Sequence, residues 1–207
     1  MDTESIVYVV DEDPSIRDAV RAIAETLGLG CKQYSSGLRF LEEYNRTRPG
    51  CLVTELRMMA ISGLQIQRRL LLDGGLIPVV FMAAQADIPT IVRAMRDGAV
   101  HFLEKPFRDQ ELWDAIQEAV ELSRERVRKQ VWRSKAASQI AGLTPKERQV
   151  LELIGQDKAK KTIASELGVC VRTIEIHRAK LMTKLEVETV PALKRVAEVA
   201  SEEPAWS

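Results

Sequence analysis

Hydrophobic residues in the first 108 positions follow two alternating spacings. Short apolar runs of strand length occur five times, as IVYVV, CKQY, CLVT, PVVFM and VHFL. Each run is followed by a segment whose apolar residues recur with helical spacing, from Pro14, near residues 37–46, at 63–73, at 89–98 and from about 109. Repeated strand–helix pairs predict an α/β fold with a doubly wound, five-stranded parallel sheet.

The second half has helical spacing only. From residue 109 to about 138 the chain contains no Pro or Gly, which predicts one long helix that continues into a linker. Thr144, Pro145 and Glu147 then form the pattern of a capping box with proline at the first helical position. Further helices are expected near residues 159–167, 172–185 and from Pro191, with Gly168 in the turn between the first two. We therefore expect an all-α, four-helix domain that contains a helix-turn-helix.

Length and composition favour two domains in one ordinary soluble chain. The protein has 207 residues, 45% of them hydrophobic and 29% charged. We expect a domain at 1–122, a helical linker at 123–139 and a second domain at 140–207. No uncharged window is long enough for a membrane span, and the acidic start lacks the basic region of a signal peptide, so we expect a cytoplasmic protein.

The three cysteines do not support a metal site or a disulfide framework. Cys31, Cys51 and Cys170 are far apart in the sequence and form no C-x-x-C motif. We expect all three to be buried or half-buried packing residues.

The formal net charge of zero conceals an uneven distribution. Residues 1–120 carry 13 Lys and Arg against 18 Asp and Glu, whereas residues 121–207 carry 17 against 12. Most of the positive excess lies between residues 121 and 185, and a local excess of this kind is typical of proteins that bind polyanions.

Charged side chains follow the predicted strands. Asp11 and Glu12 come after the first strand, Glu55 ends the third, and Lys105 follows the fifth. Because the carboxyl ends of parallel strands meet at one edge of a sheet, we expect these side chains to lie together. Neighbouring carboxylates need a compensating cation, either the lysine or Mg²⁺. A dinucleotide site is not expected, because no G-x-G-x-x-G follows the first strand.

Four segments carry a family resemblance. VYVVDEDPSIR, LRMMAISG, PVVFMAAQADIPTIVRAM and GAVHFLEKPF resemble the receiver domain of NarL/FixJ-type response regulators, over about residues 5–125. In that family an acidic pair holds Mg²⁺, an aspartate accepts a phosphoryl group, and a Thr or Ser, an aromatic residue and a lysine respond to it. The resemblance assigns the acidic pair to Asp11 and Glu12, the aromatic residue to Phe102 and the lysine to Lys105.

The family pattern is broken at several positions, two of which belong to the predicted site. Glu55 stands where the family has its phosphoacceptor aspartate, and Ala83 replaces the hydroxyl residue. The extra methylene of Glu55 moves its carboxylate by about 1.5 Å, a large shift for a reacting group. We therefore predict a degenerate receiver, independent of Asp phosphorylation, in which Glu55 is a standing charge near Lys105. No cofactor is required, although Mg²⁺ could occupy Asp11, Glu12 and Glu55. The alternatives are phosphorylation of Glu55 or another acid, and a pocket that only binds Mg²⁺ or a small ligand.

The helix expected at 172–184 has a buried side and a polar side. At 100° per residue, the buried side contains Ile174, Arg178 through its stem, Leu181 and Leu185. On the other side Arg172 can reach guanine or phosphate, Glu175 can accept from cytosine, and Ile176 and Ala179 can contact a thymine methyl. The expected phosphate contacts are Thr173, His177, Lys180 and Lys184, with Lys160 and Lys161 from the preceding helix.

This half also resembles a known family. LTPKERQVLELI and IASELGVCVRTIEIHRAKLMTKL resemble the LuxR-type helix-turn-helix, over about residues 140–200. The resemblance implies a transcription regulator that is not an enzyme, binds an inverted repeat in double-stranded DNA and forms a homodimer through the helix VPALKRVAEVA. A histidine kinase or another signalling protein is an expected partner, and a membrane is not. The rival hypotheses are a protein whose main role is phosphotransfer with a kinase, and a decoy that forms heterodimers with related regulators.

Overall fold

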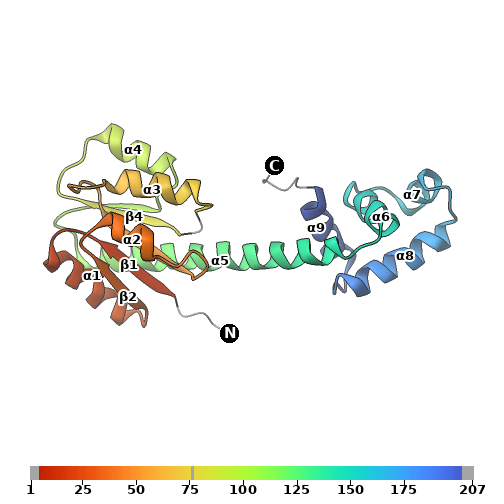
Figure 1. The fold of residues 1–207 in the computed structure, drawn as a ribbon, viewed down its shortest axis with the longest axis horizontal. Coiled ribbons are helices and arrows are strands. Elements are labelled where there is room, and N and C mark those ends of the chain that lie inside the picture. The colour runs from red at the N-terminus through yellow and green to blue at the C-terminus, as the bar shows by residue number, and fades with distance from the viewer. Residues whose placement is uncertain (1–4, 76, 202–207) are drawn as a thin grey trace. The chain divides into compact units, whose positions relative to one another are not determined.

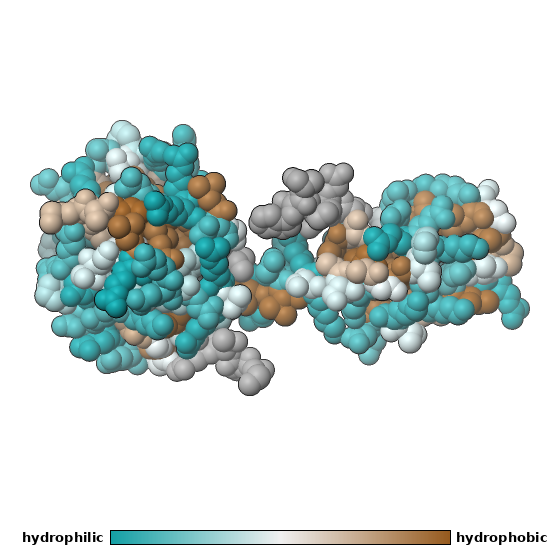
Figure 2. All heavy atoms as spheres, viewed as in Figure 1, coloured by the Kyte–Doolittle hydropathy of each residue, from teal (hydrophilic) through white to brown (hydrophobic). Residues whose placement is uncertain are grey.

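The computed structural model describes residues 5–75 and 77–201. The chain divides into two compact units, one up to Arg128 and the other from Lys129. Hydrophilic residues cover most of the visible face of each unit, and smaller hydrophobic patches lie among these residues (Figure 2). No helix in the part of the chain that the structure describes has the length and hydrophobicity needed to cross a membrane.

The first unit is built on a five-stranded parallel sheet. Its strands are β1 (Ile6–Val10), β2 (Gly30–Tyr34), β3 (Gly50–Glu55), β4 (Val79–Ala83) and β5 (His101–Glu104), in the order β2-β1-β3-β4-β5. The helices that follow them are α1 (Pro14–Thr26), α2 (Gly37–Glu43), α3 (Gly63–Leu72), α4 (Ile88–Arg96) and α5 (Asp109–Ala141). The predicted doubly wound α/β fold is confirmed.

Helices cover both faces of the sheet (Figure 1), because the strands alternate their apolar side chains between two cores. On one face, Tyr8, Leu52 and Phe81 pack with residues of α2, α3 and α4. On the other face, Val9 and Val53 pack with residues of α1 and α5. Burial of the sheet on both sides explains why the strands read as continuous apolar runs.

Gly63 allows α3 to begin directly against the end of β3. A Cβ atom at this position would lie 2.5 Å from the backbone oxygen of Glu55, so only glycine permits this approach. The amide of Gly63 also donates to the carbonyl oxygen of Leu56 at 3.0 Å. The Ser-Gly pair at residues 62 and 63 therefore fixes the loop next to Glu55.

The long helix α5 contributes to both hydrophobic cores. Near its start, Leu112 and Ile116 are fully buried against the sheet of the first unit. Near its end, Ala136 and Ile140 are buried in the core of the second unit. The single uninterrupted helix agrees with the prediction, while the boundaries at residues 122 and 139 stay predictions.

Within its described residues the second unit contains four further helices, as predicted. These are α6 (Pro145–Gly155), α7 (Lys160–Glu166), α8 (Val171–Lys184) and α9 (Val190–Ser201). The capping box of Thr144 and Glu147 begins α6. Gly168 has a φ of 64° in the turn between α7 and α8, a conformation that favours glycine. One core, including Leu151, Ile163 and Leu181, holds the helices together.

The expectation for the cysteines is wrong at one position. Cys51 is buried and Cys31 is half-buried, but Cys170 is exposed. Cys170 is the residue immediately before α8, and its Sγ lies 3.2 Å from the hydroxyl of Thr173. As the N-cap residue, Cys170 lies outside the first turn of α8 and is not part of the face that packs into the core.

Candidate functional site

The carboxyl edge of the sheet brings two acidic residues and one lysine into direct contact. Asp11 follows β1, Glu55 ends β3 and Lys105 follows β5. The Nζ atom of Lys105 lies 2.6 Å from Oδ2 of Asp11 and 2.7 Å from Oε2 of Glu55. The side chains are mostly buried, with exposed fractions of 16%, 4% and 15% for Lys105, Asp11 and Glu55. The structure therefore places these three residues together, as the topology suggested.

Every carboxylate oxygen of Asp11 and Glu55 is within reach of a donor. The second oxygen of Asp11 accepts a hydrogen bond from the amide of Asp13 at 2.9 Å. The second oxygen of Glu55 accepts from the amide of Arg57 at 3.1 Å. Burial lowers the pKa of Lys105, but its hydrogen bonds to Asp11 and Glu55 outweigh that effect and raise the pKa above its usual value. The ammonium thus stays charged between the two carboxylates.

Glu12 lies apart from this cluster. It is exposed, and its Oε1 accepts a hydrogen bond from the amide of Met59 at 2.9 Å. Within residues 5–75 and 77–201, no three His, Cys, Asp or Glu side chains are grouped so that they could hold a metal ion. The ammonium of Lys105 lies between the oxygens of Asp11 and Glu55 that Mg²⁺ would need. In this arrangement the three carboxylates do not form a cation site.

Two of the three predicted switch positions, Ala83 and Phe102, contribute no polar side chain to the pocket. Ala83 ends β4, is 1% exposed, and accepts a hydrogen bond from the amide of Lys105 through its carbonyl oxygen at 2.8 Å. Phe102 is half-buried, and its ring centroid lies 6.4 Å from that of Phe81. A phosphoryl oxygen placed beside Glu55 would find a methyl group at residue 83, where the family has a hydroxyl.

Sequence reasoning missed Arg17 as part of this region. Its Nη1 atom donates hydrogen bonds to the backbone carbonyl oxygens of Asp11 and Glu12, at 2.7 and 3.0 Å. Arg17 therefore fastens the loop that carries both acidic residues to α1. The only signal in the sequence is an arginine in the first turns of the helix that follows the acidic pair.

The second candidate site is the polar side of α8. Ile174, Leu181 and Leu185 are buried and Arg178 is half-buried, as the helical angle predicted. The exposed side consists of Arg172, Glu175, Ile176, Ala179, Lys180, Thr183 and Lys184. Ile176 is 50% exposed, although it is a large apolar residue. This helix therefore presents apolar and charged groups together on one open face.

Two of the predicted phosphate contacts are paired with carboxylates. Lys160 Nζ lies 2.9 Å from Oε1 of Glu175, and Lys184 Nζ lies 2.7 Å from Oε2 of Glu147. The hydrogen bond from Lys184, together with that from the amide of Thr144, lowers the pKa of Glu147 to about 2. The sequence identified Glu147 only as a cap, so its role as a partner of Lys184 was missed.

The remaining predicted contacts differ in accessibility. None of Lys161, Arg172 and Lys180 forms an ion pair with another residue that the structure describes, and all three are exposed. Thr173 is half-buried, next to Cys170. His177 is half-buried too, and its Nδ1 is buried without a hydrogen-bond partner in the described part of the chain. Among the predicted contacts, the cations without an ion pair to a described residue are therefore on α7 and on the exposed side of α8.

Both halves of the chain match known family models. Residues 7–117 match the response regulator receiver domain. Residues 141–197 match the bacterial regulatory proteins of the luxR family.

Individual proteins resemble the chain over nearly its whole length. The transcriptional regulatory protein FixJ of Azorhizobium caulinodans is 39% identical over 199 residues, which cover 96% of this chain and 94% of that protein. The response regulator protein TmoT of Ectopseudomonas mendocina is 35% identical, over 95% of this chain and 90% of that protein. Among solved structures, the response regulator StyR aligns with a TM-score of 0.77 and 36% identity, over 94% of this chain and 98% of that one. Full-length FixJ from B. japonicum aligns with a TM-score of 0.56 and 32% identity, over 98% and 100% of the two chains.

Proposed function

Because this chain belongs to the DNA-binding response regulators that join a receiver domain to a LuxR-type domain, we propose that it controls transcription without phosphoryl transfer to Glu55. The observation that carries this proposal is the pairing of Glu55 and Asp11 with the single ammonium of Lys105. In this proposal the carboxylate of Glu55 is a standing negative charge in a fixed position.

Transfer to Glu55 would require this arrangement to open. The nucleophile in such a transfer is a carboxylate oxygen with an accessible lone pair, and both oxygens of Glu55 accept hydrogen bonds, from Lys105 and from the amide of Arg57. Ala83 offers no donor to a phosphoryl oxygen. Mg²⁺ is not required in this proposal, since Lys105 supplies the positive charge.

The proposed DNA-recognition surface is the exposed side of α8, which would lie in the major groove. Arg172 and Lys180, with Lys161 from α7, supply cations that form no ion pair with a described carboxylate. Ile176 and Ala179 supply apolar contacts for thymine methyl groups, and Glu175 supplies an acceptor for a cytosine amino group. Thr173 and His177 flank this surface, while Lys160 and Lys184 would reach phosphate by exchanging their carboxylate partners for it.

We place the receiver at residues 1–122, the helical linker at 123–139 and the DNA-binding domain at 140–207. Two copies paired through α9 would present two α8 helices, and their half-sites would lie about one helical turn apart in an inverted repeat. We further propose that the protein acts in the cytoplasm and receives its signal from a kinase or another partner, and that it catalyses no reaction itself.

The test is selection of binding sites from random duplex DNA at one fixed salt concentration. Untreated protein should enrich an inverted repeat, and the same repeat should emerge after incubation with a phosphoryl donor and Mg²⁺. The Arg172→Ala, Lys180→Ala double variant should enrich nothing, because it lacks the central cations of α8. Enrichment only after the donor would overturn phosphorylation independence, and no enrichment under either condition would favour the heterodimerising decoy.

A further inference from the structure

We propose that a depression beside β2, in the first unit, binds a small molecule with two negative charges, such as a phosphate monoester or a dicarboxylate. The depression has a volume of about 360 Å³. It is lined by Arg17, Lys32, Gln33, Tyr34, Ser35, Arg39 and Glu43. This volume is at the lower end of the range for ligand pockets, so the ligand is small.

The lining has an uncompensated positive charge. Three of its side chains are cations and one is a carboxylate, that of Glu43, whose Oε1 lies 3.0 Å from Nε of Arg39. Lys32 forms no ion pair with any residue that the structure describes. The Arg17 guanidinium donates its hydrogen bonds to the backbone carbonyl oxygens of Asp11 and Glu12. Two cations are therefore available to an anion in the same depression.

Tyr34 adds a hydrogen-bonding group beside these cations. It is only 5% exposed, and the carboxylate of Glu43 acts on its buried hydroxyl. Burial, and after it the charge and the hydrogen bond of Glu43, raise the pKa of Tyr34, so the hydroxyl keeps its proton and can donate. An anion in the depression would offer this hydroxyl an acceptor in place of Glu43.

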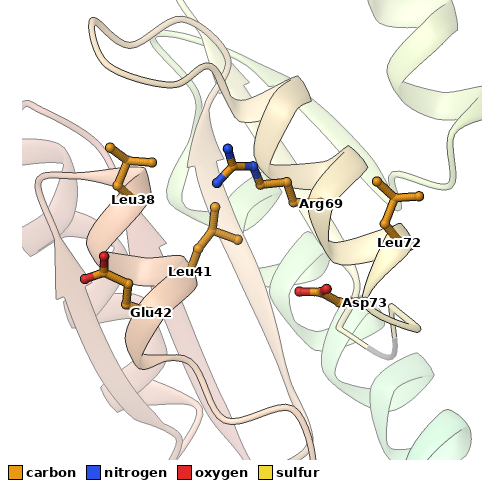
Figure 3. A pocket seen from close by; sticks show the side chains of 6 residues that line it. All are labelled: Leu38, Leu41, Glu42, Arg69, Leu72 and Asp73. Atoms are coloured by element: carbon orange, nitrogen blue, oxygen red, sulfur yellow. The ribbon is translucent and has the colours of Figure 1, made fainter.

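A second depression of similar size shows why charge matters to this assignment. It lies between α2 and α3, has a volume of about 370 Å³ and is lined by Leu38, Leu41, Glu42, Arg69, Leu72 and Asp73 (Figure 3). Its charges are mixed, and Asp73 is already paired with Arg46 at 2.9 Å. Nothing in that lining selects a ligand of one charge, whereas the depression beside β2 selects an anion.

Arg17 links the proposed anion site to the acidic pocket. The same guanidinium that lines the depression donates to the carbonyl oxygens of Asp11 and Glu12. An anion that draws Arg17 toward itself would loosen the loop that places Asp11 against Lys105. This coupling rests on the proposed function, in which a signal other than phosphorylation acts on the receiver, but binding of the anion does not.

The experiment measures binding to the full-length protein without DNA, by titration calorimetry. The probes are inorganic phosphate and succinate, each added at an ionic strength matched with chloride. Saturable binding is expected, and Lys32→Gln should raise the Kd at least about threefold, because it removes a charge-assisted contact. The matched control is Arg21→Gln, an exposed α1 cation one turn beyond Arg17 and outside the lining, which should leave the Kd unchanged. The probe that binds more tightly identifies the phosphate or the carboxylate class.

Two results would overturn the proposal. One is the absence of saturable binding of both probes to the unmodified protein. The other is equal weakening by Arg21→Gln and Lys32→Gln, which would mean general charge screening rather than a site. Thermal unfolding without probe checks that the variants remain folded. The binding measurement does not depend on whether the protein binds DNA or accepts a phosphoryl group on Glu55.

Discussion

The ammonium of Lys105 lies 2.7 Å from Oε2 of Glu55, so the residue that ends β3 is paired with a cation before any phosphoryl group arrives. The same ammonium holds Asp11, and both carboxylates are mostly buried. One lysine thereby pairs with both carboxylates at the edge of the sheet where this family has its phosphoacceptor. In the proposed function, the charge of the pocket is set by the sequence instead of by a reaction.

Incubation with a small phosphoryl donor and Mg²⁺ should leave the intact mass of the protein unchanged. The reason is that Glu55 is engaged by Lys105 and by the amide of Arg57, and Ala83 has no hydroxyl. The double variant Glu55→Asp, Ala83→Thr supplies the shorter carboxylate and the missing donor, and should gain one phosphoryl group. A gain in the unmodified protein that Glu55→Gln abolishes would contradict our interpretation.

Replacing Lys105 by methionine should lower the free energy of unfolding by about 3 kcal/mol, because two buried carboxylates would lose their shared cation. Glu55→Gln should cost less, since Lys105 keeps Asp11 as its partner. Urea unfolding of both single variants and of the double variant gives the coupling energy between the two residues. Coupling indistinguishable from zero would mean that the contact contributes nothing to the folded receiver.

Lys180→Ala and Glu175→Ala should affect DNA binding in different ways. Lys180 is an exposed cation without a carboxylate partner among the described residues, so its loss should weaken binding to all sequences and reduce the salt slope by about 1. Glu175 accepts from Lys160 at 2.9 Å, and its removal should change which base is preferred at one position, by about 1–3 kcal/mol. Affinities for the selected site and single-base variants, measured at several salt concentrations, distinguish the two. Identical behaviour would contradict the assigned roles.

Sequence reasoning was most accurate where one periodicity governs many residues. The parallel order of the strands brought Asp11, Glu55 and Lys105 to one edge, and the helical angle separated Ile174 and Leu181 from the exposed side of α8. These results follow from backbone geometry, which repeats along an element.

Sequence reasoning was least accurate where a single long side chain could contact any of several partners. Glu12 turns to the amide of Met59 rather than to Asp11, and Lys184 pairs with Glu147 from the start of α6. Such choices depend on loops and on packing between distant elements, and no periodicity in the sequence encodes them. The fastening of the β1 loop by Arg17 was missed for the same reason.

The pair formed by Glu147 and Lys184 should make the stability of the second unit depend on pH. Because the hydrogen bond from Lys184 lowers the pKa of Glu147 from 4.5 to about 2, its stabilising contribution is complete above about pH 4.5 and is lost as the pH falls toward 2. In this window the unfolded carboxyl binds a proton that the folded one does not. The free energy of unfolding should therefore rise with pH.

The measurement is urea unfolding of the unmodified protein and Glu147→Gln across pH 2 to 5. The variant should be less stable at pH 5, and the difference between the two proteins should shrink as the pH falls. Glu152→Gln, at an exposed position of the same helix, is the matched control and should follow the unmodified protein. A constant difference between Glu147→Gln and the unmodified protein at every pH would mean that the ion pair with Lys184 does not account for the stabilising contribution of Glu147. Lys184 would then be available to DNA phosphate without a cost to the fold.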